Sequence, residues 1–267
     1  VVIDQGPLFA TGGSSSHAPG LVFQTNASQT MTELARYTVE RYGSETLDGQ
    51  PCFHQVGGIE VAATPQRWTD LQRKRGLAGA WGVEAELIGP NEVHDRLPHV
   101  DPARIHGGLY VPSDGIAKPV RAAEAMARTA QRHGVRFFGH TEVTGFEVED
   151  GRVRTVSTSQ GDIEIETVLC CAGIWGPKLG KLAGVSMPLF PVAHKYAVTS
   201  PVQGLPFDSG EVAQPILRHQ DSSMYFRQIN DRYGVGSYQH RVIPVHTDEL
   251  HPTSAAGNGA EAPSDGG

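Results

Sequence analysis

The stretch between residues 118 and 171 limits the possible folds more than any other part of the chain. Apolar residues recur at helical spacing over 118–133, and Gly134 ends the pattern, which predicts a helix. Asp150-Gly151 and Gln160-Gly161 are turn sequences that separate apolar runs. These runs predict strands over 135–140, 142–149, 152–157 and 163–171. A helix followed by a meander and a buried strand indicates an α+β insertion in an α/β fold.

Short elements joined by turns make up the rest of the predicted structure. The 267 residues include 32 Gly and 18 Pro, a composition that favours turns over a helical bundle. Ser28 and Thr64 are in N-cap positions, the second directly before a proline. The predicted helices are 29–41, 65–76 and 90–97, and the predicted strands are 1–4, 52–62 with a break at Gly57-Gly58, 85–88, 106–111, 193–199, 215–218, 223–228 and 232–236.

Charge and hydropathy argue against two classes of partner. The net charge of −7 is not that of a protein with a basic, nucleic-acid-binding face. No run of 18 apolar residues is present, so we expect no membrane span. No basic-then-apolar signal segment opens the sequence, and we expect a cytoplasmic protein.

The two ends of the sequence differ in character. Val1-Val2-Ile3-Asp4 has the pattern of a buried strand already under way, so we expect the chain to be part of something larger. Residues 251–267 contain no Val, Ile, Leu, Met or aromatic residue. Such a segment cannot bury enough apolar surface to offset its ordering entropy, and we predict a disordered tail.

The cysteines and histidines predict neither a disulfide framework nor a metal site. Cys52 stands alone, and Cys170 and Cys171 are adjacent within an apolar run typical of a strand. Neither a C-x-x-C nor an H-E-x-x-H pattern occurs, so we expect no bound metal.

Two segments near the N-terminus have the residue types of a nucleotide site. Asp4 ends the first predicted strand, where an acid can accept hydrogen bonds from ribose hydroxyls, although Asp is also common in turns. Residues 11–20 are rich in Gly and Ser and contain His17, a composition suited to a pyrophosphate or ribityl chain or to a flexible linker. The G-x-G-x-x-G pattern is absent, because Gly234-Val235-Gly236 lacks the third glycine.

These segments resemble dimethylglycine oxidase and the related dimethylglycine and sarcosine dehydrogenases. The likeness begins at 4–8 and 12–22, continues at 55–58, 111–115, 171–176 and 215–221, and is collinear over about residues 1–245. It implies a D-amino-acid-oxidase-like fold: an FAD-binding Rossmann-like domain, here over 1–50 and 113–178, and an antiparallel-sheet substrate domain over 51–112 and 179–250. It also implies oxidation of the N-methyl group of a glycine-derived amine, with oxygen or an electron-transfer flavoprotein as acceptor.

The resemblance gives roles to individual residues around the flavin. His17 matches the histidine that carries the flavin covalently in the family. Asp4 and Gln5 match the ribose-binding pair, and Val143 matches a residue whose backbone meets the adenine. The flavin loop corresponds to Ser14, Ser15, Ser16 and Leu21, and Ala172 and Gly173 belong to a strand-ending motif beside the cofactor.

Two residues match the substrate side of the family's active site. His194 corresponds to an active-site histidine and Tyr225 to an active-site tyrosine that also lies near the cofactor. A histidine can take or hold the amine proton while a hydride leaves for the flavin. We therefore expect the two side chains to lie together, although about 30 residues separate them.

The sequence also departs from the family's pattern. By comparison with the family, we expect the first strand, its glycine loop and the following helix to be missing, together with the end of the flavin domain and the folate-binding C-terminal region. We expect this chain to bind FAD weakly or not at all, because the helix that holds the pyrophosphate is expected to be missing. The alternative is therefore that the chain is an inactive remnant of such an enzyme and binds no flavin.

Overall fold

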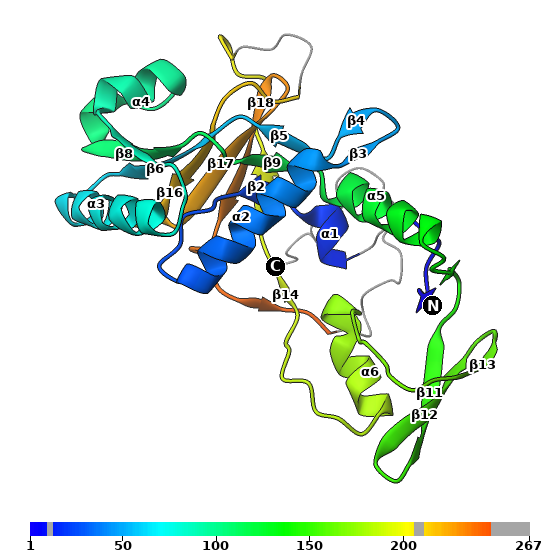
Figure 1. Cartoon of the computed structure of the whole chain (residues 1–267). Helices are drawn as coiled ribbons and strands as arrows, with labels where there is room; N and C mark the ends of the chain where they lie inside the picture. The colour runs from blue at the N-terminus through cyan, green and yellow to red at the C-terminus, as the bar shows by residue number, and fades with distance from the viewer. Residues whose placement is uncertain (10–12, 206–210, 247–267) are drawn as a thin grey trace. The chain divides into compact units, whose positions relative to one another are not determined.

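The computed structural model describes residues 1–9, 13–205 and 211–246. The chain forms two compact units, each described by itself below (Figure 1). Unit 1 contains residues 1–18, 123–193 and 242 onward, and unit 2 contains residues 19–122 and 194–241. The predicted FAD and substrate parts follow different boundaries and stay predictions, because compactness does not show which residues contact a cofactor. The predicted disordered tail lies outside the described residues.

Unit 2 is built on a seven-stranded mixed sheet. All neighbouring strands run antiparallel except β16 and β6, which are parallel. In spatial order the strands are β15 (Tyr196–Val198), β18 (Arg232–Ser237), β17 (Met224–Ile229), β16 (Ile216–His219), β6 (Gly58–Ala62), β8 (Gly107–Val111) and β7 (Glu86–Ile88). Every residue of β6 is buried, as expected for the central strand of a sheet covered on both faces.

Two helices cover opposite faces of this sheet (Figure 1). Helix α3 (Pro65–Ala80) packs Leu71 against Ala62 and Leu109. Helix α4 (Pro90–Arg96) and Leu97, which follows it, pack against Ile59 and Val61, which alternate with Ala62 along β6. The predicted Thr64 cap is confirmed, since its side chain accepts a hydrogen bond from the Arg67 backbone at the start of α3.

A smaller sheet and one long helix complete unit 2. Its strands are β2 (Leu21–Val22), β9 (Gly115–Ala117) and β5 (Phe53–Gln55), with β9 in the centre. Helix α2 (Gln29–Ser44) begins at the predicted Ser28 cap. The remaining elements are the hairpin β3 (Thr46–Leu47) and β4 (Gln50–Pro51) and the 3₁₀ turns η1 (Pro102–Arg104) and η3 (Gln220–Ser222). Helix α5 (Pro119–Arg132) begins in unit 2 and continues into unit 1.

Unit 1 contains a parallel strand pair and a three-stranded meander. The parallel pair is β1 (Val2–Ile3) with β10 (Phe137–Phe138). The meander is β11 (Val143–Glu149), β12 (Arg152–Thr158) and β13 (Gly161–Glu164). The predicted Asp150-Gly151 hairpin is confirmed, with both residues at positive φ. The other elements are α1 (Gly13–His17), η2 (Gly173–Trp175), α6 (Gly176–Leu182), β14 (Val192–Ala193) and β19 (Ile243–Pro244).

Two sequence predictions for unit 1 are wrong in detail. The strand predicted over 163–171 is only β13, which ends at Glu164, and Leu169 is 85% exposed. In the part of the chain that the structure describes, no strand lies beside 167–171, so these apolar residues have no sheet to join. The predicted Gly- and Ser-rich loop is a short helix over Gly13–His17, while Thr11 and Gly12 lie outside the described residues.

The turn between β8 and β9 buries one carboxylic acid, Asp114, which is 1% exposed. Its Oδ1 accepts hydrogen bonds from the Gln24 backbone and side chain, both at 3.0 Å. Its Oδ2 is buried without a hydrogen-bond partner, and a Cβ at Gly58 would come within 2.7 Å of it. Burial raises the pKa of Asp114 from 3.8 to about 7, although Gln24 and Arg218 favour the charged form.

This carboxyl makes folding stability depend on pH. Between pH 3.8 and about 7 the folded chain holds a proton that the unfolded chain has lost, so stability falls as pH rises. The expected loss is about 4 kcal/mol at most. Asp114→Asn keeps the acceptor for Gln24 and removes the ionisation. Urea unfolding at pH 4.5 and pH 7.5 is expected to show this loss in the unsubstituted chain and in Asp95→Asn, an exposed control, but not in Asp114→Asn. Equal pH dependence in all three would contradict this account.

Candidate functional site

His194 and Tyr225 form the centre of the candidate site in unit 2. The His194 Nε2 lies 3.0 Å from the Tyr225 hydroxyl, and their rings are stacked with centroids 5.9 Å apart. The predicted strand 193–199 is broken, so that His194 and Lys195 lie between β14 and β15. That break leaves the His194 side chain free to turn toward β17. The expectation that these two side chains lie together is confirmed.

Strand register explains why Tyr225 lies on this face of the sheet. Side chains of residues paired across adjacent strands share a face. Tyr225 pairs with Arg218 on one side and with Gly236 on the other, and Gly236 pairs with Tyr196. Arg218 pairs in turn with Glu60 of β6. One row across the sheet therefore carries an acid, an arginine, two tyrosines and a glycine.

Three further aromatic side chains surround the pair. Tyr238 stacks on His194 with centroids 4.5 Å apart, and Tyr196 stacks near Tyr225 at 6.3 Å. The His194 Nδ1 lies 3.2 Å from the His240 Nε2. We call these five residues, His194, Tyr196, Tyr225, Tyr238 and His240, the histidine–tyrosine cluster. Sequence reasoning missed Tyr196, Tyr238 and His240, since only their packing against Tyr225 and His194 distinguishes them.

Two glycines in β18 make room for the tyrosine rings. A Cβ on Gly236 would lie 2.0 Å from the Tyr225 Cζ, and one on Gly234 would overlap the Tyr196 hydroxyl. Alternate glycines on one strand face are the signal of a close approach. The Gly234-Val235-Gly236 pattern, which fails as a nucleotide fingerprint, is therefore part of the candidate site.

The environment shifts the ionisation of both central groups. Burial raises the pKa of Tyr225 to about 12, and Tyr238 and Tyr196 add to the shift. Burial lowers the pKa of His194, and the neighbouring His240 lowers it further. At neutral pH the pair is therefore a phenol beside an uncharged imidazole.

An ion-pair network lies at the other end of this row of the sheet, around Glu60 and Arg218. Glu60, 2% exposed, binds the Lys74 ammonium through both oxygens at 2.9 and 2.8 Å and lies 3.8 Å from Arg218. The Arg218 guanidinium stacks on the Phe23 ring at 4.0 Å. The network also contains Arg67, which lies 3.9 Å from Glu60 and pairs with Asp70 and Asp221. Because its three acids balance its three bases, this network holds β6 and β16 in register rather than offering a free charge.

The predicted cofactor residues of unit 1 lie at the end of β1, at the start of β11, and in the two neighbouring segments α1 and η2. Asp4 follows β1, its carboxylate exposed, and its Oδ1 accepts the Gly6 N–H at 2.7 Å. Gln5 follows it, and Val143 opens β11. Helix α1 packs on η2, because a Cβ on Gly13 would lie 2.9 Å from the Trp175 ring. This packing brings together the predicted flavin residues of two segments. They are Ser14, Ser15, Ser16 and His17 in α1 and Ala172 and Gly173 at η2.

His17 is exposed, and its local contacts define its tautomer. Its Nδ1 lies 2.8 Å from the Gly13 carbonyl oxygen, which can only accept. We therefore assign the proton to Nδ1, which leaves the lone pair on Nε2. Leu21, the remaining predicted flavin-loop residue, belongs to unit 2, where β2 pairs with β9.

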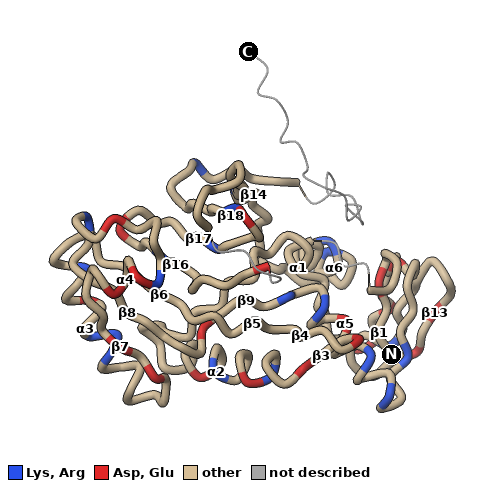
Figure 2. The backbone as a smooth tube through the Cα atoms, turned by 90° about the horizontal axis from the view of Figure 1, so that it is seen from above, with Lys and Arg blue, Asp and Glu red and all other residues tan. Residues whose placement is uncertain are grey.

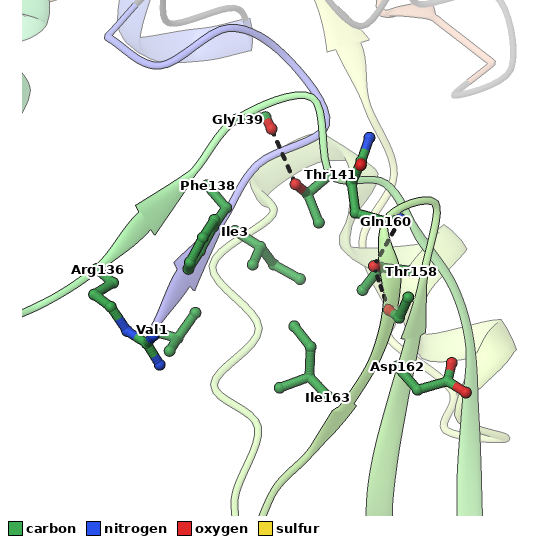
Figure 3. Close-up of a pocket in the computed structure, with 11 residues that line it drawn as sticks. Val1, Ile3, Arg136, Phe138, Gly139, Thr141, Thr158, Gln160, Asp162 and Ile163 are labelled. Atoms are coloured by element: carbon green, nitrogen blue, oxygen red, sulfur yellow. Dashed lines mark hydrogen bonds between the residues drawn. The ribbon is translucent and has the colours of Figure 1, made fainter.

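Unit 1 also contains a cavity of about 580 Å³ (Figure 3). Val1, Ile3 of β1 and Ile163 of β13 point into it. No predicted cofactor residue is among those that line it. We assign it no role in the proposed chemistry.

Metal sites and membrane spans can be assessed for the described part of the chain. Among those residues no group of three or more His, Cys, Asp or Glu is arranged to hold a metal ion. No described helix is both long and apolar enough to cross a bilayer. Acidic and basic residues are interspersed along both units (Figure 2).

Comparison with known proteins identifies the class of the chain. The profile of the DAO family, described as FAD dependent oxidoreductase, matches residues 1–260. The chain belongs to this family. It is 31% identical to mouse mitochondrial sarcosine dehydrogenase over 92% of its length, and 30% identical to rat mitochondrial dimethylglycine dehydrogenase over 86%. It spans 27% of the length of each of these relatives.

A solved structure confirms the fold. The L-proline dehydrogenase of P. horikoshii superposes with a TM-score of 0.75 at 21% identity, over 87% of this chain and 61% of that one. The predicted fold class, an FAD-binding α/β domain with a sheet domain, is thus confirmed.

The described residues suit the cofactor that the family name implies. An exposed carboxylate at the end of a parallel strand can accept ribose hydroxyls. The α1 segment presents serine hydroxyls and an imidazole to solvent beside η2. This donor and acceptor set fits a nucleotide and a polar flavin side chain.

Proposed function

We propose that the protein containing this chain oxidises the N-methyl group of a glycine-derived amine such as sarcosine or dimethylglycine. The observation that carries the proposal is the 3.0 Å contact between His194 and Tyr225 in unit 2. The named relatives at about 30% identity, a sarcosine and a dimethylglycine dehydrogenase, support this substrate class.

The chemistry divides between the cofactor and the chain. FAD, when bound, supplies the acceptor for the hydride that leaves the N-methyl carbon. An N-methylamine is mostly an ammonium ion at neutral pH, and its lone pair must be freed before the hydride can leave. Tyr225 orients the nitrogen through its hydroxyl oxygen, and the uncharged His194 behind it accepts the proton. Hydrolysis of the resulting iminium releases formaldehyde and the demethylated amine.

A product assay tests this function. The gene product that contains this chain is incubated with a dye acceptor and with sarcosine, dimethylglycine, glycine or L-proline. We expect formaldehyde in equal molar amount to reduced dye with the two N-methyl amines. Glycine and L-proline carry no N-methyl group and are expected to give none. Dye reduction without formaldehyde would contradict the proposed reaction.

We also propose where the flavin is held. Residues 1–50 and 113–178 form the FAD-binding part, and residues 51–112 and 179–250 the substrate part. Asp4, Gln5 and Val143 bind the adenosine end, and the segments around α1, Leu21 and η2 bind the flavin end. The exposed Nε2 of His17 supports a covalent bond to the flavin at this atom.

His17→Ala is expected to release the flavin on denaturation. In the gene product, trichloroacetic acid should precipitate a yellow protein, whereas the variant should leave all its flavin in the supernatant. Absorbance at ~450 nm, a property of oxidised flavins, quantifies both fractions. The matched control is His133→Asn, another exposed histidine, which should keep its flavin in the pellet. Flavin that stays with precipitated His17→Ala would contradict the assignment.

A further inference from the structure

His240 is the member of the histidine–tyrosine cluster that sequence reasoning did not single out as functional. It follows β18, is half-buried, and belongs to the same compact unit as His194 and Tyr225. Its two ring nitrogens have different partners, and each partner can play only one hydrogen-bonding role. These two partners of His240 determine the direction of every hydrogen bond in the cluster.

The His240 tautomer is fixed from both sides of its ring. Its Nδ1 lies 2.8 Å from the Arg241 carbonyl oxygen, which can only accept, so Nδ1 carries the proton. Its Nε2 lies 3.5 Å from the Lys195 backbone N–H, which can only donate, so Nε2 carries the lone pair. Two independent contacts therefore assign the same tautomer.

This tautomer determines the next two hydrogen bonds. His194 Nδ1 lies 3.2 Å from the His240 Nε2 lone pair, so it must donate. The neutral His194 then has its lone pair on Nε2, 3.0 Å from the Tyr225 hydroxyl. Tyr225 therefore donates to His194, and its oxygen lone pairs stay available to a substrate N–H.

We propose that His194 and His240 form a two-histidine relay, which carries the amine proton from Tyr225 through His194 to His240. The relay rests on the proposed function and adds a path to it. The substrate ammonium gives a proton to the Tyr225 oxygen as the Tyr225 proton moves to His194 Nε2. The His194 Nδ1 proton then moves to His240 Nε2. One proton enters and one positive charge ends on His240, with no electrons moved.

Charge favours this direction of transfer. Burial and the proximity of His240 lower the pKa of His194, so a proton does not rest there. The groups that face the two imidazoles are the Tyr225 and Tyr238 rings, with Tyr196 stacked behind Tyr225. Burial raises the pKa of Tyr225 and of Tyr196, so neither is a phenolate at neutral pH.

Nuclear magnetic resonance of the chain labelled with ¹⁵N-histidine tests the relay without any bound flavin. Long-range ¹H–¹⁵N correlations report which ring nitrogen carries the proton. We expect both His194 and His240 in the Nδ1–H form at pH 8. On titration, His194 is expected to protonate at lower pH than the usual histidine pKa of 6.5.

Two variants separate orientation from proton transfer. His240→Asn keeps an acceptor oxygen for His194, so His194 should stay in the Nδ1–H form, whereas His240→Ala should lose that tautomer. Both should raise the pKa of His194, because His240 no longer repels its charge. In the holoenzyme, both should shift the pH profile of kcat/KM, and His106→Asn should not.

The result that overturns the relay is an Nε2–H tautomer at either histidine in the unsubstituted chain. An unchanged His194 spectrum in His240→Ala would overturn it equally. Because the spectra need neither substrate nor turnover, failure of the relay and failure of the proposed function are distinguishable.

Discussion

Gly236→Ala is expected to abolish the contact between Tyr225 and His194 and to slow flavin reduction about 100-fold or more, within the range for losing an acid–base group. The new methyl would lie 2.0 Å from the Tyr225 Cζ, so the ring must leave its place over β18. Gly236 is not at positive φ, and the effect therefore comes from contact and not from backbone strain. Overpacking of this kind also costs about 1–3 kcal/mol of folding stability.

A double-mutant cycle separates this clash from a general loss of structure. In a Tyr225→Ala background the ring is gone, so adding Gly236→Ala should cost little further stability. Gly43→Ala is the matched control, since Gly43 lies in α2 with open space around its Cα, and it should keep the activity. Stopped-flow reduction and urea unfolding measure the two effects. Additive losses in the double mutant would contradict the proposed clash.

Tyr225→Phe is expected to lower the rate of flavin reduction by about 10- to 100-fold. The ring is 8% exposed and keeps its packing in the variant, so only the hydroxyl between His194 and the substrate nitrogen is lost. An interaction made mainly in the transition state lowers kcat more than it raises KM. His194→Ala is expected to change the pH profile of the same step, because the proton acceptor is removed.

The matched control for Tyr225→Phe is Tyr233→Phe. Tyr233 also donates a hydroxyl hydrogen bond, to Gln214 at 2.6 Å, but it pairs with Gln228 and so lies on the opposite face of the sheet. Loss of the Tyr233 hydroxyl should lower the folding stability and leave the rate of flavin reduction unchanged. Equal effects of the two variants on the rate would remove Tyr225 from the active site.

Local signals in the sequence predict most elements of the fold. Ser28 and Thr64 mark the starts of α2 and α3, and Gly57 divides the strand of 52–62 at a positive φ of 81°. The strand predicted over 163–171 fails because a strand needs a neighbour, which composition does not reveal. The loop predicted around Gly13–His17 is a helix, because packing against η2 outweighs the low helix propensity of glycine and serine.

The candidate site is only partly predictable. His194 and Tyr225 can be matched to a known pattern, but their convergence depends on the register of β17 and on the break before β15. His240 carries no local signal, because its role follows from three hydrogen bonds to His194, Lys195 and Arg241. Long-range strand pairing and ring orientation are properties of the folded chain, which residue spacing does not encode.

Anaerobic mixing of the flavin-loaded gene product with sarcosine or dimethylglycine tests directly whether this protein oxidises N-methyl amines. We expect the flavin band at ~450 nm to bleach in a single phase, at a rate that saturates with either amine and that Tyr225→Phe lowers. Glycine at the same concentration should leave the band unchanged. A flavin that stays oxidised with every N-methyl amine tried, in a protein that binds FAD, would contradict the proposed function.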